Sequence, residues 1–258
     1  MDNILRIGNI KRFAKQTMRG KWLRGIAVML LYAVIQNAPS FILSYVTESN
    51  VVSYLLLIYR LLISGPLLMG VTCFFLDSFR GTEEPGLGSF GKGFSYGLKA
   101  IQLFVICAAL IFLWSLLFVI PGILAYIRYS QSFFILADDP TKNPIDCIRE
   151  SKYYMQGRKG RYFLLQLSFI GWFILAALPS SLLMRDYIDM TGIMSIEPME
   201  EAIIRASQAP LVVVLELLVY IVMAYVLASN ACFYDILSGN LKVLYREDPQ
   251  DGETQGMY

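Results

Sequence analysis

Three charged residues stand inside long apolar stretches of this 258-residue sequence: Arg60, Arg128 and Glu216. A charge in the middle of a bilayer costs at least about 2.5 to 3.5 kcal/mol unless it is paired or hydrated, so such residues are candidates for function. Counted inward from the expected outer ends of their stretches, they lie about nine, six and six residues deep, or roughly 9 to 14 Å. We therefore expect them to meet in one layer as an intramembrane polar site.

The chemistry expected of this site is binding. One carboxylate facing two guanidiniums leaves a surplus positive charge. That surplus suits a lipid phosphate or another anionic group, because guanidinium binds such oxygens bidentately. In the simpler alternative, Glu216 neutralises one arginine and the other arginine extends to the membrane surface.

The sequence pattern offers no catalytic or metal site. The chain has no histidine, which excludes histidine-based general bases and the commonest zinc sites. Its four cysteines stand singly, and most fall in apolar stretches where a thiol acts as a small hydrophobe. Asp138, Asp139 and Pro140 are expected to end a helix, since metal binding needs more converging oxygens. We predict no catalytic residue, no metal and no cofactor.

Nucleic acids and nucleotides are not expected as partners. The net charge of +2 is too small to indicate a nucleic-acid partner. Gly86, Gly88 and Gly91 have G-x-G-x-x-G spacing, but this pattern indicates nucleotide binding only between a strand and a helix. Here it lies between two apolar stretches.

The composition indicates that these residues are positioned by helices in a membrane. The sequence is 56% hydrophobic and only 16% charged, whereas soluble domains carry roughly 25% charged residues. Several apolar runs continue for about 20 residues, which is the length needed to cross roughly 30 Å of hydrocarbon. We predict one all-α domain over residues 1–258, which is a polytopic bundle of membrane-spanning helices. Its expected partners are membrane lipids.

Six stretches are predicted to span the membrane, preceded by a basic interfacial helix over residues 1–22. The predicted spans are residues 25–46, 51–76, 98–120, 123–137, 162–184 and 210–237. In the first helix, six basic residues surround an apolar face, which is typical of a helix on an anionic leaflet. A second amphipathic helix is predicted from Asn143 to Gln156, capped by Asn143 and ended by Gly157.

The topology depends on whether residues 123–137 recross the bilayer. If they do not, the basic segment that includes Lys142, Arg149 and Lys152 would lie outside, opposite the basic amino terminus. Short basic loops prefer the cytoplasm, so we predict a return span of about 15 residues and both termini in the cytoplasm. The acidic segment after residue 185 is then expected outside.

Glycine and proline residues are expected to break helices and allow close packing. Pro66 follows Gly65 inside the second span, and Pro121 and Gly122 separate the third and fourth. Proline removes a helix hydrogen bond, and glycine lets helices approach closely. Gly171 is expected to serve packing in the fifth span.

Several motifs resemble a known family. They are Ile120-Pro121-Gly122, Arg128-Tyr129-Ser130, Leu136 to Pro140, Glu150-Ser151, Met155-Gln156-Gly157 and Leu167 to Trp172. These motifs resemble the bacterial integral membrane family catalogued as domain of unknown function 975. The basic amino terminus, Gly65-Pro66 and Ala231 to Tyr234 look similar too. The resemblance implies a multi-span membrane protein of a kind found widely among Gram-positive bacteria, with no established activity to carry over.

The function expected from these features is non-enzymatic. We expect an integral protein of the cell membrane, a small permease-like or accessory component that binds a lipid, a peptide or a partner protein, which could be a second copy. Two alternatives stay open. One is an intramembrane enzyme acting on a lipid through Glu216 or Asp138, and the other is a structural or immunity-type scaffold.

Overall fold

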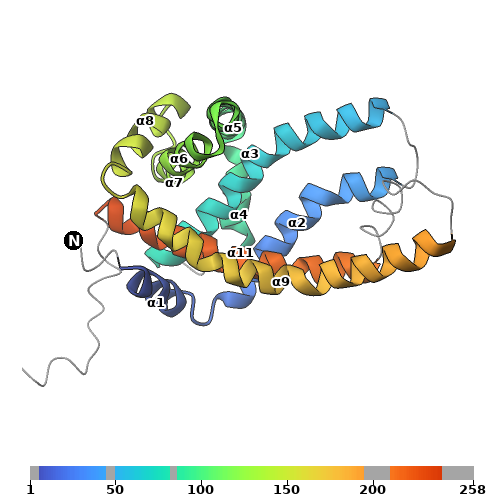
Figure 1. Ribbon diagram of the computed structural model, residues 1–258. Coiled ribbons are helices and arrows are strands. Elements are labelled where there is room, and N and C mark those ends of the chain that lie inside the picture. The colour runs from blue at the N-terminus through green and yellow to red at the C-terminus, as the bar shows by residue number, and fades with distance from the viewer. Residues whose placement is uncertain (1–5, 45–49, 82–85, 195–209, 240–258) are drawn as a thin grey trace, which may run out of the picture.

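The computed structural model of the chain describes residues 6–44, 50–81, 86–194 and 210–239. Every regular element within these residues is an α-helix (Figure 1). The helices are α1 Ile7–Thr17, α2 Trp22–Ser44, α3 Asn50–Arg80, α4 Leu87–Ser95, α5 Gly97–Leu117, α6 Val119–Tyr129, α7 Ser132–Asp138, α8 Pro144–Tyr154, α9 Lys159–Met194 and α11 Pro210–Leu237.

The predicted all-α membrane bundle is confirmed. Within the described ranges, five helical segments are long and apolar enough to cross a membrane: Val51–Arg80, Gly97–Leu117, Val119–Asp138, Lys159–Arg185 and Val214–Leu237. Helix α2 covers most of the first predicted span but is not among the five, and it carries the polar residues Gln36 and Asn37. The count of six spans and the side of each terminus therefore stay predictions.

The turn between the third and fourth predicted spans lies earlier than expected. Helix α5 ends at Leu117, Phe118 is extended with φ −163° and ψ 159°, and α6 begins at Val119. Pro121 lies in the first turn of α6, where a missing N–H costs no helix hydrogen bond, and does not form the turn itself. The return segment Val119–Asp138 is consequently 20 residues long, enough for about 30 Å of hydrocarbon.

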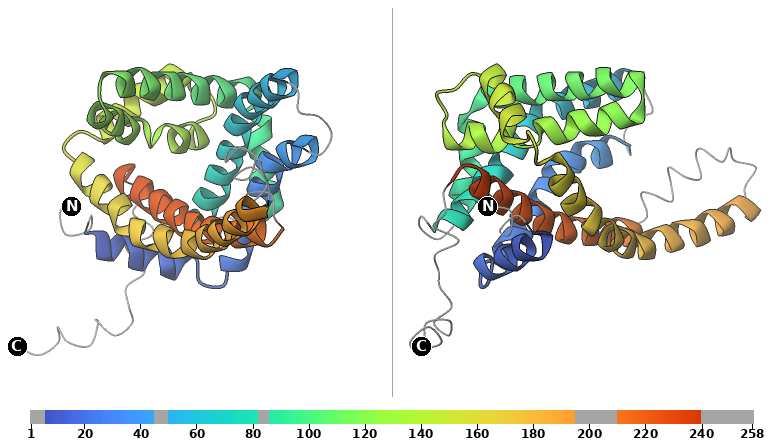
Figure 2. Two further views of the ribbon diagram at one scale, coloured as in Figure 1. Left: turned by 45° about the vertical axis from the view of Figure 1, so that its right-hand side comes forward. Right: turned by 60° about the vertical axis from the view of Figure 1, so that its left-hand side comes forward.

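Three helical hairpins organise the molecule: α2 with α3, α5 with α6, and α9 with α11 (Figure 1). The hairpins diverge on one side, which we call the open end, while α1, α4, α7 and α8 gather on the other, the packed end (Figure 2). Buried side chains concentrate at the packed end, from Leu67 to Phe79 in α3 and from Ala228 to Leu237 in α11. Apolar side chains along the diverging arms are exposed, as lipid contact requires.

Helix α3 changes direction near its middle (Figure 1), where Gly65 and Pro66 interrupt its hydrogen bonding. The half before this point is mostly exposed and the half after it is mostly buried. A Cβ atom on Gly65 would lie 2.6 Å from the carbonyl oxygen of Ala100 in α5. The predicted break therefore also allows α3 and α5 to pack closely.

Helix α1 differs from the prediction in what its apolar face contacts. Ile10, Ala14 and Met18 are fully buried against the core instead of facing lipid. Helix α1 packs on α11 and α9, and Lys11 Nζ donates a hydrogen bond to the Ser168 carbonyl at 3.1 Å. Helices α9 and α11 therefore cover the apolar face of α1, and close packing between protein side chains stabilises this contact.

Helix α8 lies where it was predicted, but it ends at Tyr154, earlier than expected, and the Asn143 side chain makes no capping hydrogen bond. Asn143 precedes the helix in an extended conformation, Pro144 occupies its first turn, and Gly157 has φ +71° just beyond its end. Cys147, Ile148 and Ser151 form its buried face. The acidic segment expected outside, residues 195–209 above all, lies outside the described residues.

Candidate functional site

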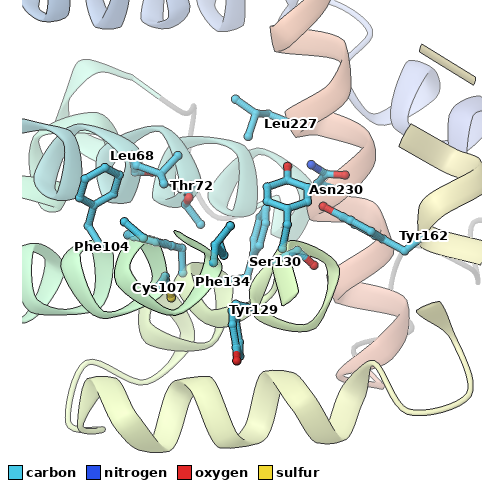
Figure 3. A pocket seen from close by; sticks show the side chains of 14 residues that line it. Leu68, Thr72, Phe104, Cys107, Tyr129, Ser130, Phe134, Tyr162, Leu227 and Asn230 are labelled. Atoms are coloured by element: carbon cyan, nitrogen blue, oxygen red, sulfur yellow. Dashed lines mark hydrogen bonds between the residues drawn. The ribbon is translucent and has the colours of Figure 1, made fainter. Parts of the chain in front are cut away.

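A cavity of about 260 Å³ lies between α3, α5, α6, α9 and α11, beside the start of α7. Aliphatic and aromatic side chains form most of its wall, including Leu68, Phe104, Phe134 and Leu227 (Figure 3). None of the described side chains that line it is charged. A small apolar pocket with a few polar groups is the usual form of a binding site for an uncharged organic molecule.

Three polar groups of the cavity gather on one side, and Thr72 lies on the other, beside Leu68 (Figure 3). The three are Ser130, Tyr162 and Asn230, which Figure 3 shows away from Leu68 and Phe104. Gln166 Nε2 donates to Asn230 Oδ1 at 2.7 Å, which fixes the amide. Hydroxyl and amide groups held in this way can orient one uncharged polar group of a ligand. The opposite wall is mostly apolar, because the Thr72 hydroxyl there already donates to the Leu68 carbonyl at 2.8 Å.

The cavity adjoins an interrupted helix. Helix α6 ends at Tyr129 and α7 begins at Ser132, and Ser151 of α8 lies against the interruption. Ser151 Oγ donates to the Arg128 carbonyl at 2.7 Å and accepts from the Gln131 N–H at 3.2 Å. One hydroxyl therefore replaces two helix contacts, as a break away from water requires.

A charged cluster joins three helix ends at the packed end. Arg80, the last residue of α3, forms an ion pair with Asp138 at the end of α7. Its Nε lies 3.3 Å from Asp235 Oδ1 in α11, and the Asp235 side chain is only 3% exposed. Tyr234 donates a hydrogen bond to Asp138 Oδ2 at 2.9 Å. The ends of α3, α7 and α11 therefore meet in one layer, so the segment Val119–Asp138 brings the chain back to the packed end.

Comparison with known proteins identifies the family of this chain. A sequence model of the family described as "Protein of unknown function (DUF975)" matches residues 99–241, more than half of the chain. The chain belongs to the DUF975 family. Neither the curated proteins nor the solved structures give a significant match. The match covers α5 through α11 and hence Ser151, Asp138 and Asp235, while the basic amino terminus and Gly65-Pro66 of this DUF975 protein lie outside it.

Aromatic rings connect the cavity to the charged cluster of this DUF975 protein. Phe134, which lines the cavity, stacks on Tyr234 with ring centroids 5.4 Å apart. Tyr154 of α8 also contacts Tyr234, edge to face, with ring centroids 6.3 Å apart. Tyr234 therefore contacts both the cavity wall and the Asp138 carboxylate.

Charged groups near α8 are held in fixed protonation states. The hydrogen bond from Lys142 to Glu150, 2.7 Å long, raises the pKa of Lys142. Burial is the main cause that raises the pKa of Tyr154, and Glu150 adds to it. Hydrogen bonds from Thr141 lower the pKa of the Asp139 carboxyl. At neutral pH Lys142 and Asp139 are charged and Tyr154 is neutral.

The sequence-predicted polar site of this DUF975 protein is not assembled by ion pairs. None of the ion pairs within the described ranges joins Arg60, Arg128 or Glu216. Arg60 donates from Nη2 to Ser40 Oγ at 3.0 Å, and Glu216 is exposed on α11. Any pairing between them stays a prediction.

The three residues differ in their separation along the chain from the packed end. Along their helices, Arg60 and Glu216 lie about 20 residues, or roughly 30 Å, from the Arg80–Asp235 pair. Arg128 lies only about 10 residues, or roughly 15 Å, from Asp138, and Ser151 of α8 contacts its carbonyl. Counted instead from the starts of α3, α6 and α11, Arg60, Arg128 and Glu216 lie ten, nine and six residues in, so the shared layer stays a prediction.

The predicted packing residues separate into tight and open positions. A Cβ atom on Gly122 would clash with the Ser115 side chain of α5, as one on Gly65 would with Ala100. A Cβ atom on Gly171 would meet nothing within 4 Å. Gly65 and Gly122 therefore permit close helix contacts, whereas Gly171 lies at an open position of α9.

Arg80 and Asp235 were not predicted as site residues. Each lies in the last turns of an apolar helix, where a charge is equally consistent with a solvated helix end. The signal that could identify them is topological: Arg80, Asp138 and Asp235 end three predicted spans on one side of the membrane. Within the described residues, no group of three His, Cys, Asp or Glu side chains is placed to hold a metal.

Proposed function

We propose that this DUF975 protein is a non-enzymatic, permease-like or accessory component of the cell membrane that binds an uncharged amphipathic molecule from the bilayer. The observation that supports this function is the cavity of about 260 Å³, with a mostly aromatic and aliphatic wall and three polar groups, Ser130, Tyr162 and Asn230, on one side (Figure 3). Its ligand is expected to be mostly apolar, because no charged side chain among the described lining residues could compensate a ligand charge.

The proposed topology places the packed end at the cytoplasmic face. Exposed basic residues of α1 and α8, including Arg12, Lys15 and Lys152, belong to this end, and short basic segments are retained in the cytoplasm. The open end then lies in the outer half of the membrane, where its exposed apolar arms contact lipid.

The carboxylates considered for lipid chemistry support a binding role instead. Asp138 is paired with Arg80 and accepts a hydrogen bond from Tyr234, so its oxygens are engaged. Glu216 is exposed on α11 and does not line the cavity. A general base must reach the reacting group, and neither carboxylate meets that requirement for a molecule in the cavity.

The test is to fill the cavity and measure what the purified protein carries. Ala108 of α5 lines the cavity, while Ala109 is the next residue and is exposed. Ala108→Phe and Ala109→Phe therefore add the same side chain inside and outside the site. Each variant and the parent are purified in detergent, and their organic extracts are compared by mass spectrometry.

We expect the parent and Ala109→Phe to retain one class of molecule in a constant molar ratio, and Ala108→Phe to lose at least about nine-tenths of it. Equal retention by Ala108→Phe and Ala109→Phe would refute the cavity as the binding site. A second polypeptide in fixed ratio to the parent would support an accessory role over a permease-like one. Unfolding midpoints of the variants confirm that both fold.

A further inference from the structure

Besides the cavity, the outer face of α1 is a surface whose residues indicate the chemistry of a ligand. Its inner face is fixed on the spans: Ile10, Ala14 and Met18 are fully buried, and Lys11 Nζ lies 4.0 Å from the Phe169 ring centroid. Tyr225 donates a hydrogen bond to the Lys11 carbonyl at 3.3 Å. Helix α1 is therefore held at one depth along α9 and α11 (Figure 1).

The outward face of α1 is basic. Four exposed residues form it and its continuation: Arg6, Arg12, Lys15 and Arg19. The sequence has no aspartate or glutamate between residues 6 and 24. Among the ion pairs of the described residues, none involves these four side chains. By contrast, Lys21 is used internally, since its Nζ donates to the Ser78 carbonyl at 3.0 Å.

Aromatic and apolar residues mark a membrane boundary at the same place. Trp22 directly follows this segment and contacts Tyr225 edge to face, with centroids 5.6 Å apart. Leu23 is 83% exposed beside it. Tryptophan and tyrosine favour the headgroup level, and an exposed leucine there can reach acyl chains.

We infer that the basic face of α1, comprising Arg6, Arg12, Lys15 and Arg19, binds the anionic phospholipid headgroups of the leaflet in which the packed end lies. The membrane is the occupant favoured by the structure, because the face adjoins Trp22, Leu23 and the spans themselves. Basic side chains near an anionic leaflet gain attraction that acts within a Debye length. Since α1 is fixed on α9 and α11, the bound lipids form a shell in one place on the protein.

The experiment uses Trp22 of the full-length protein as the reporter. Trp114→Phe and Trp172→Phe leave Trp22 as the single tryptophan of the three. The protein is reconstituted into vesicles of equal parts phosphatidylglycerol and phosphatidylcholine, in which only one lipid carries bromine near its headgroup. Both preparations have the same composition, so the difference in Trp22 quenching measures which lipid lies beside α1.

The matched variants are Arg12→Gln with Lys15→Gln, and Arg149→Gln with Lys152→Gln. Both pairs remove two exposed basic residues three positions apart on a helix of the packed end. We expect brominated phosphatidylglycerol to quench Trp22 more than brominated phosphatidylcholine in the parent. The α1 variant should lower this local enrichment by on the order of tenfold at low salt, and the α8 variant should leave it largely unchanged.

Equal quenching by the two lipids in the parent would overturn the inference and would leave an acidic protein as the remaining occupant. Equal loss in both double variants would also overturn it, since whole-molecule charge would then explain the preference. Loss of the preference in the parent at 1 M salt supports it, because the Debye length falls to about 3 Å. The outcome is independent of whether the cavity binds a ligand.

Discussion

At the scale of single residues, Arg80 neutralises two carboxylates at the packed end. It contacts both Asp138 and Asp235, and the Asp235 side chain is 3% exposed. Arg80→Gln would leave that carboxylate buried without a cation. We expect a loss of about 2 to 3 kcal/mol in the free energy of unfolding, near the lower end for buried pairs because Arg80 is 25% exposed. Denaturant titration in detergent measures it.

The control for Arg80 is an exposed ion pair on α8. Arg149 Nη1 lies 3.3 Å from Asp146 Oδ1, with both side chains more than half exposed. Arg149→Gln should change the free energy of unfolding by less than about 0.5 kcal/mol. A loss for Arg80→Gln no larger than for Arg149→Gln would show that the three-helix cluster does not stabilise the packed end.

The positions of charged residues can be predicted from sequence more easily than their partners. A charge inside an apolar run can be recognised from sequence, and Arg60, Arg128 and Glu216 were selected in this way. Whether such a charge finds a partner depends on helix rotation and neighbours, which periodicity does not determine for helices apolar on all sides. The partners of Asp138 therefore emerge only from the fold.

At the scale of elements, the joint between α6 and α7 depends on a side chain from α8. Ser151→Ala removes the hydrogen bonds to the Arg128 carbonyl and from the Gln131 N–H. Gln131 is fully buried, so its N–H gains no water in exchange. We expect a loss of about 2 kcal/mol in the free energy of unfolding and faster hydrogen exchange at the Gln131 amide.

The comparison variant for the joint is Ser181→Ala in α9. Ser181 is exposed and its hydroxyl donates to the Leu178 carbonyl of its own helix at 2.9 Å. This change should alter the free energy of unfolding by no more than about 0.5 kcal/mol. If Gln131 exchanges at the same rate in the parent and in Ser151→Ala, Ser151 does not close the joint.

The contact between α3 and α4 offers a second element-scale prediction. A Cβ atom on Gly93 would collide with the backbone of Gly70 and lie 2.5 Å from the Pro66 carbonyl oxygen, whereas one on Gly91 would meet nothing within 4 Å. We expect Gly93→Ala to destabilise the protein by about 3 kcal/mol or more, because backbone atoms cannot move aside. Gly91→Ala should stabilise it by up to about 1 kcal/mol through helix propensity.

The two glycine variants lie in one short helix, so the difference in unfolding midpoint between them isolates the contact from propensity. Similar midpoints would mean that α4 can shift away from α3. Gly88 and Gly91 of the G-x-G-x-x-G spacing lie in the same helix, α4.

At the scale of the whole molecule, the sequence determines helix positions better than helix arrangement. Apolar runs of membrane length predict helices reliably because the bilayer leaves the backbone few alternatives. Charge predicts that α1 and α8 share one side, but the way α1, α4, α7 and α8 pack at the packed end could not be predicted (Figure 2). It depends on contacts between residues far apart in the sequence, such as Lys11 with Ser168, for which composition and charge give no signal.

The compartment of the packed end is the property of the whole molecule that most needs testing. All four native cysteines are buried, so a single added cysteine dominates labelling by a membrane-impermeant maleimide. Lys15→Cys in α1 and Lys152→Cys in α8 should stay unlabelled in intact cells and react after lysis, because both exposed positions belong to the packed end. Ser195→Cys, in the acidic segment predicted outside, should react in intact cells. Labelling of Lys152→Cys but not Lys15→Cys from outside would place α1 and α8 in different compartments, which the meeting of α3, α7 and α11 at Arg80 does not permit.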